Sequence, residues 1–283
     1  MAEAAQAYAD WLGGTEERQD VLTAPAVRRM LALLDDVDTV LGDGDALPPL
    51  WHWMLFTPEA PQRQIDIDGH PKRGGFLPPV DLPRRMFAGA SIRFLAPLPI
   101  GAAVRRHGRI TAITEKSGKS GRLVFVTAVY DIFAGETHCT EETQNVVYRE
   151  MGAPQSEPAA DVALPAPPAG AWSQVVTPDP VQLFRYSALT NNGHRIHYDR
   201  PYTLQEEGYP GLVVHGPYIA TWLAELVRRH AGRPVAGLSF QARAPIFDTA
   251  AFRVEGVAEG DSVDLKAVRC DGETAMVMQV QLG

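Results

Sequence analysis

Residues 88–97 read AGASIRFLAP, and residues 236–245 read AGLSFQARAP. The two stretches share the pattern AGxSxxxxAP at a spacing of 148 residues, and Arg85 recurs as Arg233 at the same spacing. A weaker repeat precedes them at a spacing of 154 residues, in which Val21, Thr23 and Val27 correspond to Val175, Thr177 and Val181. Because the repeats keep their order, we interpret the chain as a duplication in which one loop has changed length.

The segments around the repeats predict an antiparallel sheet in each half. Alternating or β-branched runs predict strands over residues 109–113, 123–132 and 145–148, and again over 251–257, 262–268 and 275–281. Helices are predicted over 21–34, with Thr23 as N-cap, after Thr177 as the equivalent N-cap, and after Gly216 and Pro217. Each half is therefore expected to be a sheet with a main helix packed against it, which is the α+β class.

A proline-rich stretch divides the chain. Five prolines stand among Ala, Ser and Gly between residues 153 and 171, which is typical of an extended linker. The predicted organisation is an N-terminal domain over 1–152, a linker over 153–171 and a C-terminal domain over 172–283. Two domains are also what a length of 283 residues suggests.

Composition excludes several classes of function. A formal net charge of -8 argues against nucleic-acid or anionic-membrane binding, which needs a surplus of Lys and Arg. Two cysteines, Cys139 and Cys270, are too few for a disulfide scaffold and indicate a reducing compartment. The N-terminal residues 1–14 lack the pattern of a signal peptide, and the most apolar window, 211–227, is too short to cross a bilayer. We therefore expect a cytoplasmic protein.

The densest polar cluster lies in the second half, over residues 186–199 and 206–217. It holds His194, His197 and His215 together with Asn192 and Asp199. Any one of these histidines alone would suit a structural role. Together, beside the start of a helix, they favour a functional site.

This cluster resembles the MaoC-like hot-dog hydratases and dehydratases. Their motif is approximately Gly-Asp-x-Asn-Pro-[Ile/Leu]-His, followed by His-Gly at the start of the central helix, and the matching segments here are 191–197 and 215–216. The chain departs from the motif where the family's Asp is Asn192 and where its Asn-Pro pair is His194-Arg195.

The fuller pattern is similar to one branch of that family, which contains the hydroxyacyl-thioester dehydratases type 2 and the itaconyl-CoA and mesaconyl-C4-CoA hydratases. Residues 187–199, 207–216, 68–79, 82–86 and 88–89 carry the likeness. The resemblance implies a double hot-dog fold with a degenerate N-terminal domain and a catalytic C-terminal domain. It also implies a homodimer and an enzyme that hydrates a 2-enoyl-CoA, or dehydrates a 3-hydroxyacyl thioester, with no cofactor beyond the CoA of its substrate.

Hydration of an enoyl thioester explains the residue types. It needs a group that deprotonates water, a proton for the α-carbon and a donor for the enolate-like oxygen. The resemblance assigns proton transfer to His197 and the backbone donor to Gly216, while Asn192 is expected to orient water because it cannot exchange a proton as Asp could. His194, Asp199 and His215 are reserve candidates for a second proton-transfer group or for supporting roles.

The first half lacks an equivalent cluster, so we expect one active site per chain. Its basic residues Lys72, Arg73, Arg84 and Arg85 could receive CoA phosphates or a substrate carboxylate, or could be ordinary surface charges. A short dicarboxylic acyl group, of the itaconyl or mesaconyl type, would carry a carboxylate for these arginines to bind.

Other motifs are rejected. Gly118-Lys-Ser120 lacks the preceding glycine of a phosphate-binding loop and is expected to be a strand turn, and the histidine spacing does not predict a metal site. Two alternative functions stay open: a hot-dog acyl-CoA thioesterase and a non-catalytic acyl-thioester-binding module.

Overall fold

The computed structural model describes residues 7–118, 121–152 and 164–283. Residues 1–6 of the N-terminal segment, Lys119 and Ser120 of the expected strand turn and residues 153–163 of the expected linker lie outside these ranges. The α-helices are α2 (Ala24–Leu33), α3 (Pro180–Thr190), α4 (Arg200–Gln205) and α5 (Gly216–His230). The strands are β1 (Thr15–Val21), β2 (Arg84–Phe94), β3 (Ala103–Gly118), β4 (Gly121–Ala134), β5 (Thr137–Arg149), β6 (Trp172–Val176), β7 (Val235–Ala242), β8 (Phe252–Glu259), β9 (Ser262–Val268) and β10 (Thr274–Leu282). None of the helices in the described ranges is long and apolar enough to cross a membrane.

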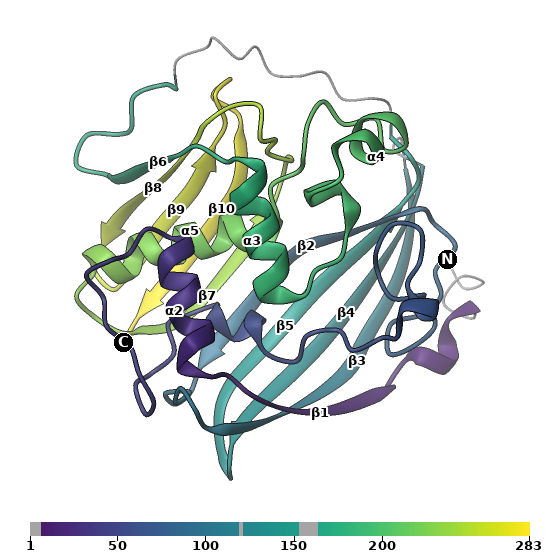
Figure 1. Ribbon diagram of the computed structural model, residues 1–283, viewed down its shortest axis with the longest axis horizontal. Coiled ribbons are helices and arrows are strands. Elements are labelled where there is room, and N and C mark those ends of the chain that lie inside the picture. The colour runs from purple at the N-terminus through teal and green to yellow at the C-terminus, as the bar shows by residue number, and fades with distance from the viewer. Residues whose placement is uncertain (1–6, 119–120, 153–163) are drawn as a thin grey trace.

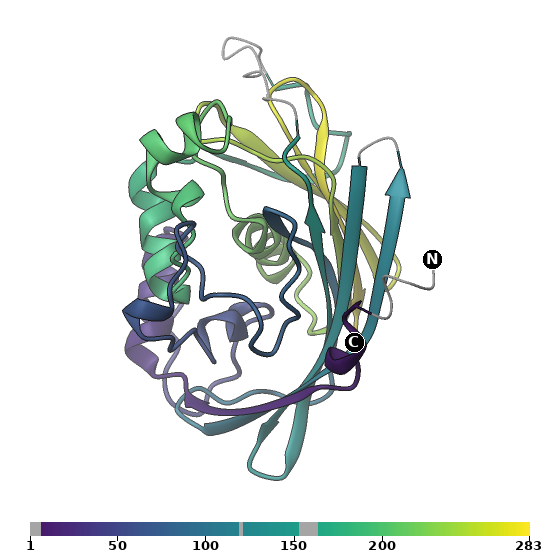
Figure 2. The same cartoon turned by 90° about the vertical axis from the view of Figure 1, so that its right-hand side faces the viewer.

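All ten of these strands join one antiparallel sheet in the order β1-β3-β4-β5-β2-β7-β10-β9-β8-β6 (Figure 1). The α-helices lie on one face of the sheet, with α5 nearest to it and α2 and α3 further out (Figure 2). Every strand predicted from the sequence overlaps one of these strands, and the prediction of 251–257 begins one residue before β8. The α+β double hot-dog architecture is thereby confirmed, with strands β1–β5 from the first half and β6–β10 from the second.

The two AGxS repeats pair with each other at the centre of the sheet. They form the β2–β7 contact, in which Ser91 lies opposite Ser239 and Arg93 opposite Gly237. Ser91 and Ser239 are equivalent residues of the two repeats, so a local two-fold axis passes between them. Gly89 is required here because a Cβ atom at this position would lie 2.2 Å from the carbonyl oxygen of Phe240.

The two halves share the element order strand, helix and four further strands, so β1 and α2 correspond to β6 and α3. They differ in the segment before the repeat. The second half places α5 there, packed against β8, β9 and β10. In the first half, residues 34–83 contain only the short 3-10 helices η2 (Trp51–Met54) and η3 (Gln62–Gln64). The expectation of a main helix on each sheet is therefore met only in the second half, since α2 packs against α3.

The predicted N-cap at Thr177 is wrong. Helix α3 begins two residues later, after Asp179, whose carboxylate accepts hydrogen bonds from the backbone N–H of Val181 at 2.7 Å and Gln182 at 3.1 Å. Pro180 explains the shift, because proline suits the first helical position and holds the residue before it in an extended conformation. In the first half, Thr23 is the N-cap of α2 as predicted.

The largest hydrophobic cluster joins the halves. It includes Val27 and Trp51 from the first half and Leu183, Tyr218 and Leu223 from the second. Cys139 and Cys270 are both buried and unpaired. Smaller separate clusters lie under the loops, with Val80 and Leu82 in one and Ile196 and Tyr209 in another.

We predict that Gly89→Ala destabilises the fold, because the added methyl group would press on the backbone of β7 at the centre of the sheet. The expected loss in the free energy of unfolding is about 1–3 kcal/mol, the usual cost of overpacking. Urea denaturation followed by circular dichroism measures it. Gly42→Ala is the matched control, since a Cβ atom at Gly42 would meet no atom within 4 Å. Equal unfolding free energies for the two variants would contradict the prediction.

Candidate active site

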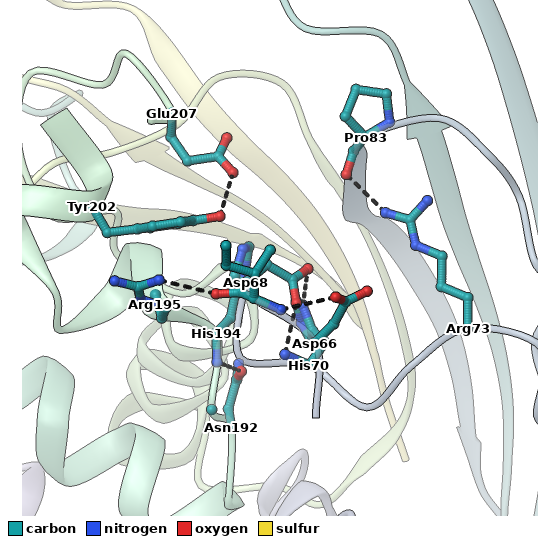
Figure 3. Close-up of polar contacts among 12 residues, drawn as sticks. Asp66, Asp68, His70, Arg73, Pro83, Asn192, His194, Arg195, Tyr202 and Glu207 are labelled. Atoms are coloured by element: carbon teal, nitrogen blue, oxygen red, sulfur yellow. Dashed lines mark hydrogen bonds and ion pairs between the residues drawn. The ribbon is translucent and has the colours of Figure 1, made fainter. Parts of the chain in front are cut away.

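The polar segment between α3 and α4 begins where α3 ends. Asn191 terminates the helix in the left-handed conformation, with φ 46°, and its side-chain amide donates a hydrogen bond to the carbonyl oxygen of Pro58 at 2.7 Å. Asn192 follows, and its Oδ1 accepts a hydrogen bond from the backbone N–H of His194 at 3.0 Å (Figure 3). These contacts hold the segment against the first half of the chain and leave the Asn192 NH₂ group as the free end of that side chain.

His197 is held as a neutral imidazole with a defined tautomer. Its Nδ1 lies 2.7 Å from the carbonyl oxygen of Val213, which can only accept, so Nδ1 carries the hydrogen and Nε2 keeps a lone pair. Burial lowers the pKa of His197 to about 3. The ring stacks on His215 at a centroid distance of 3.6 Å. Nε2 therefore keeps a lone pair that can accept a hydrogen bond at neutral pH.

His215 and Gly216 form the start of α5. Nε2 of His215 lies 2.8 Å from the hydroxyl oxygen of Ser187, and burial, with the neighbouring His197 and His194, holds the pKa of His215 well below its usual range. Gly216 is the first residue of α5, and within the described ranges its N–H has no hydrogen-bond partner. A Cβ atom there would meet nothing within 4 Å. An unpartnered N–H at the positive end of a 15-residue helix, beside open space, suits a developing negative charge.

A cleft of about 520 Å³ opens beside these residues. The second half contributes Asn192, Gly193 and Pro217 to its wall, and the first half contributes Trp53 and His70 among others. His197 is 7% exposed and is not among the residues that line the cleft. The cleft is therefore built by both halves, although the cluster seen in the sequence belongs to the second half alone.

The first half adds two polar residues that the sequence reasoning did not select. Oδ2 of Asp68 lies 3.0 Å from Nδ1 of His70, and the His70 ring lies 4.2 Å from the ring of His194 (Figure 3). Asp68, His70 and His194 each place one potential metal-ligand atom within 4.8 Å of the others. The segment 68–79 carried part of the family resemblance, which was the only sequence signal for these residues, because folding alone brings them to His194.

A close backbone approach fixes this junction between the halves. The N–H of Arg195 donates to the carbonyl oxygen of Asp68 at 2.9 Å. A Cβ atom on Gly69 would lie 1.8 Å from the carbonyl oxygen of Gly193, so only glycine allows the two loops to meet. His70 and Asn192 are thereby held in one wall.

Asp199 lies at the edge of this arrangement. Its carboxylate accepts from the backbone N–H of Tyr202, which caps α4, and binds Arg195 at 2.7 Å. The hydrogen bonds from Arg195 and Tyr202 hold the pKa of Asp199 below its usual range. The side chain therefore supports the loop that carries His194 and His197.

The basic residues of the first half have different surroundings. Arg73 donates to the backbone carbonyl oxygens of Val80, Leu82 and Pro83, the last at 2.8 Å (Figure 3). Arg84 is buried against Glu207, with Nε 3.2 Å from its carboxylate. Both guanidinium groups are thus used inside the protein.

Lys72 and Arg85 differ from those two arginines. Lys72 is exposed. Arg85 is half-buried, and its positive charge contributes to lowering the pKa values of His70 and His194, after their burial. Among the described residues Arg85 has no ion-pair partner within 4.0 Å, and its charge acts on His70 and His194.

Known proteins resemble this chain in both sequence and fold. Residues 50–248 match the family model "Hydroxyacyl-thioester dehydratase type 2". The chain is 52% identical over 273 residues to the mesaconyl-C4-CoA hydratase of Chloroflexus aurantiacus, covering 96% of this chain and 97% of that protein. A MaoC-like dehydratase from Phytophthora capsici superposes with a TM-score of 0.69 at 16% identity, covering 97% and 98% of the two chains. A double hot-dog protein of Mycobacterium tuberculosis superposes with a TM-score of 0.60 at 11% identity, covering 96% of each.

The buried histidines predict a loss of stability in mild acid. His194, His197 and His215 have folded-state pKa values below the ordinary value of 6.5. Below about pH 6.5 the unfolded chain therefore binds protons that the folded chain does not, so stability is complete above that pH and falls as the pH drops. Each such histidine costs up to about 1.4 kcal/mol per pH unit. Urea denaturation at pH 7.5 and 5.5 measures this, and an unchanged free energy of unfolding would contradict it.

Proposed function

The chain belongs to the hydroxyacyl-thioester dehydratase type 2 family, a MaoC-like branch of hot-dog hydro-lyases, and we propose that its substrate is mesaconyl-C4-CoA. The observation that carries this proposal is 52% identity to a mesaconyl-C4-CoA hydratase across nearly the whole of both chains. The substrate is an enoyl thioester whose acyl group ends in a free carboxylate. The reaction adds water across its double bond.

The start of α5 suits the thioester end of such a substrate. When hydroxide adds to the β-carbon, the double-bond electrons move toward the thioester oxygen, which becomes enolate-like. The Gly216 N–H is an unpartnered donor at the positive end of the helix, where such a charge is stabilised best. Pro217 borders the cleft, so a thioester lying there would reach this donor.

His197 and Asn192 suit the water. Nε2 of His197 has the lone pair needed to accept a hydrogen from water, because Nδ1 is committed to Val213. The Asn192 NH₂ group is free to donate to the water oxygen, because its Oδ1 is already occupied by the His194 N–H. We infer that these two groups orient the water toward the β-carbon.

Two further properties remain predictions of ours. A homodimer is expected from the family resemblance, and β1 and β6 are the edge strands that end the sheet. A cytoplasmic location is expected from the composition, and the two free cysteines suit a reducing compartment.

The proposed activity predicts that the purified protein removes the enoyl-thioester absorbance of mesaconyl-C4-CoA without releasing free thiol. His197→Ala should lower kcat by about 10²- to 10⁴-fold, the usual contribution of such a group. Parallel assays of absorbance and free thiol measure both quantities. Thiol release by the wild-type protein would instead indicate a thioesterase, and binding without either signal would indicate a non-catalytic module.

The charge of Arg85 acts on the cleft residue His70, and we infer that it favours an acyl group with a free carboxylate. Arg85→Gln should lower kcat/KM for mesaconyl-C4-CoA by about 10- to 100-fold, because a charge-assisted hydrogen bond is lost. It should leave crotonyl-CoA, which has no such carboxylate, nearly unaffected. Arg93→Gln is the matched control, because Arg93 lies on the same strand but pairs with Glu141 at 3.2 Å. Equal losses on both substrates would contradict the assignment.

A further inference from the structure

The Asp68–His70 pair is a carboxylate–imidazole pair that the first half places in the cleft. Oδ2 of Asp68 and Nδ1 of His70 are 3.0 Å apart, and their side chains are 22% and 19% exposed. His70 borders the same cleft as Asn192 and Pro217. The pair is therefore accessible from the cleft and partly shielded from bulk solvent.

The pair is held rigidly. It stands in a tight turn in which the N–H of Asp66 donates to the carbonyl oxygen of His70 at 2.7 Å and the N–H of Gly69 donates to that of Asp66 at 3.0 Å. The backbone N–H of His70 also donates to Oδ1 of Asp68 at 2.8 Å. The close approach of Gly69 to Gly193 then fixes this turn against the second half.

The hydrogen bond between the two side chains defines the state of each. A carboxylate only accepts, so Nδ1 of His70 carries the hydrogen and Nε2 keeps a lone pair. Burial of Asp68 favours its neutral form, but the hydrogen bonds from the side chain and backbone of His70 outweigh it and hold the pKa of Asp68 below its usual range. Asp68 therefore stays ionised and can stabilise a positive charge on His70.

Asn192 explains why a second acceptor is needed. A water molecule poised for addition has two O–H groups that need acceptors, and its oxygen has two lone pairs, one of which must face the β-carbon. An aspartate at position 192, as in the family motif, would offer a free carboxylate oxygen. Asn192 instead offers an N–H, since its only oxygen is bound to the His194 N–H. One acceptor at the water site is thereby exchanged for a donor.

We propose that the Asp68–His70 pair supplies the missing acceptor and carries the proton of the reaction, which extends the proposed hydratase function and rests on it. Nε2 of His70 takes one proton from the water while its oxygen bonds to the β-carbon and the double-bond electrons move to the thioester. The imidazolium then returns that proton to the α-carbon. Both hydrogens and the oxygen of the water end in the product, and His70 is neutral again.

In this proposal residues of both halves contact the water. Nε2 of His197 accepts the second O–H, and the Asn192 NH₂ group donates to one lone pair. His70 is the better proton carrier because it has a carboxylate partner, whereas Nδ1 of His197 bonds to a backbone carbonyl oxygen. The catalytic centre is therefore shared between the halves.

The matched control lies elsewhere in the first half. His138 and Asp131 form a second pair of the same kind, with Nε2 and Oδ1 3.0 Å apart and side chains 32% and 28% exposed. That pair joins β5 to β4 and does not border the cleft. Substitution of His138 therefore removes an imidazole paired with a carboxylate without changing any residue of the cleft.

The first test compares His70→Ala, His70→Gln and Asp68→Asn with His138→Ala on mesaconyl-C4-CoA. We expect His70→Ala and His70→Gln to lower kcat by about 10²- to 10⁴-fold, Asp68→Asn to lower it less, and His138→Ala to leave it unchanged. The Kd for a saturated dicarboxylic acyl-CoA should stay within about threefold in every variant. Circular dichroism confirms folding, and the conservative His70→Gln variant serves if His70→Ala unfolds.

The second test restores the acceptor at its family position. The double variant, His70→Ala with Asn192→Asp, should have a kcat at least about tenfold higher than that of His70→Ala alone, because the new carboxylate can take the proton. Added imidazole should also raise the rate of His70→Ala but not that of His197→Ala. A merely structural role for His70 would respond to neither treatment.

The outcomes separate the two proposals. If the wild-type protein hydrates no enoyl-CoA, the proposed function fails. If it does so while His70→Ala keeps kcat within about threefold of wild type, the proton-transfer assignment alone is overturned. It is also overturned if chelation abolishes wild-type activity and Zn²⁺ restores it, since Asp68, His70 and His194 would then serve as metal ligands.

Discussion

The antiparallel contact between β2 and β7 is the interaction on which the rest of the structure depends. It joins the sheets of the two halves into one, with Ser91 opposite Ser239. The contact needs close backbone approach, which Gly89 permits. Because the strands run antiparallel, the two halves are related by a local two-fold axis, and their helices and loops come to lie on the same face of the sheet (Figure 2).

The two halves differ in the segments that build the cleft. The second half keeps α5, whose N-terminus offers the Gly216 N–H. The first half has an irregular segment in the corresponding position, and that segment extends to the second half, where Gly69 meets Gly193. Because the first half has no long helix at this point, residues 34–83 form loops instead. Those loops bring Asp68 and His70 into the cleft.

The sequence predicted local features better than contacts between distant segments. The strands and α5 were readable, because each depends on residues close together along the chain. The N-cap at Thr177 was wrong because Pro180 selects Asp179 as the cap. A one-dimensional repeat also could not show that only one half carries a long helix against the sheet.

Long-range packing decided the remaining parts of the site. Four basic residues of the first half looked equivalent in the sequence, yet the guanidinium groups of Arg73 and Arg84 are committed to internal contacts. Asp68 and His70 were not selected, because they reach His194 only through the meeting of the two loops. Whether a charged residue is available for a ligand depends on which residues it pairs with, and that pairing is decided only in the folded chain.

The histidine cluster is compatible with folding only because its members are neutral. The rings of His70 and His194 lie 4.2 Å apart and those of His197 and His215 only 3.6 Å apart, so positive charges on neighbours would repel strongly. Burial removes that charge and leaves ring nitrogens that accept hydrogen bonds. A positive charge that forms during the reaction is therefore stable only beside a carboxylate. Of the two histidines that contact the water in the proposed mechanism, His70 is the one with such a partner, and in that mechanism Asp68 determines where the proton goes.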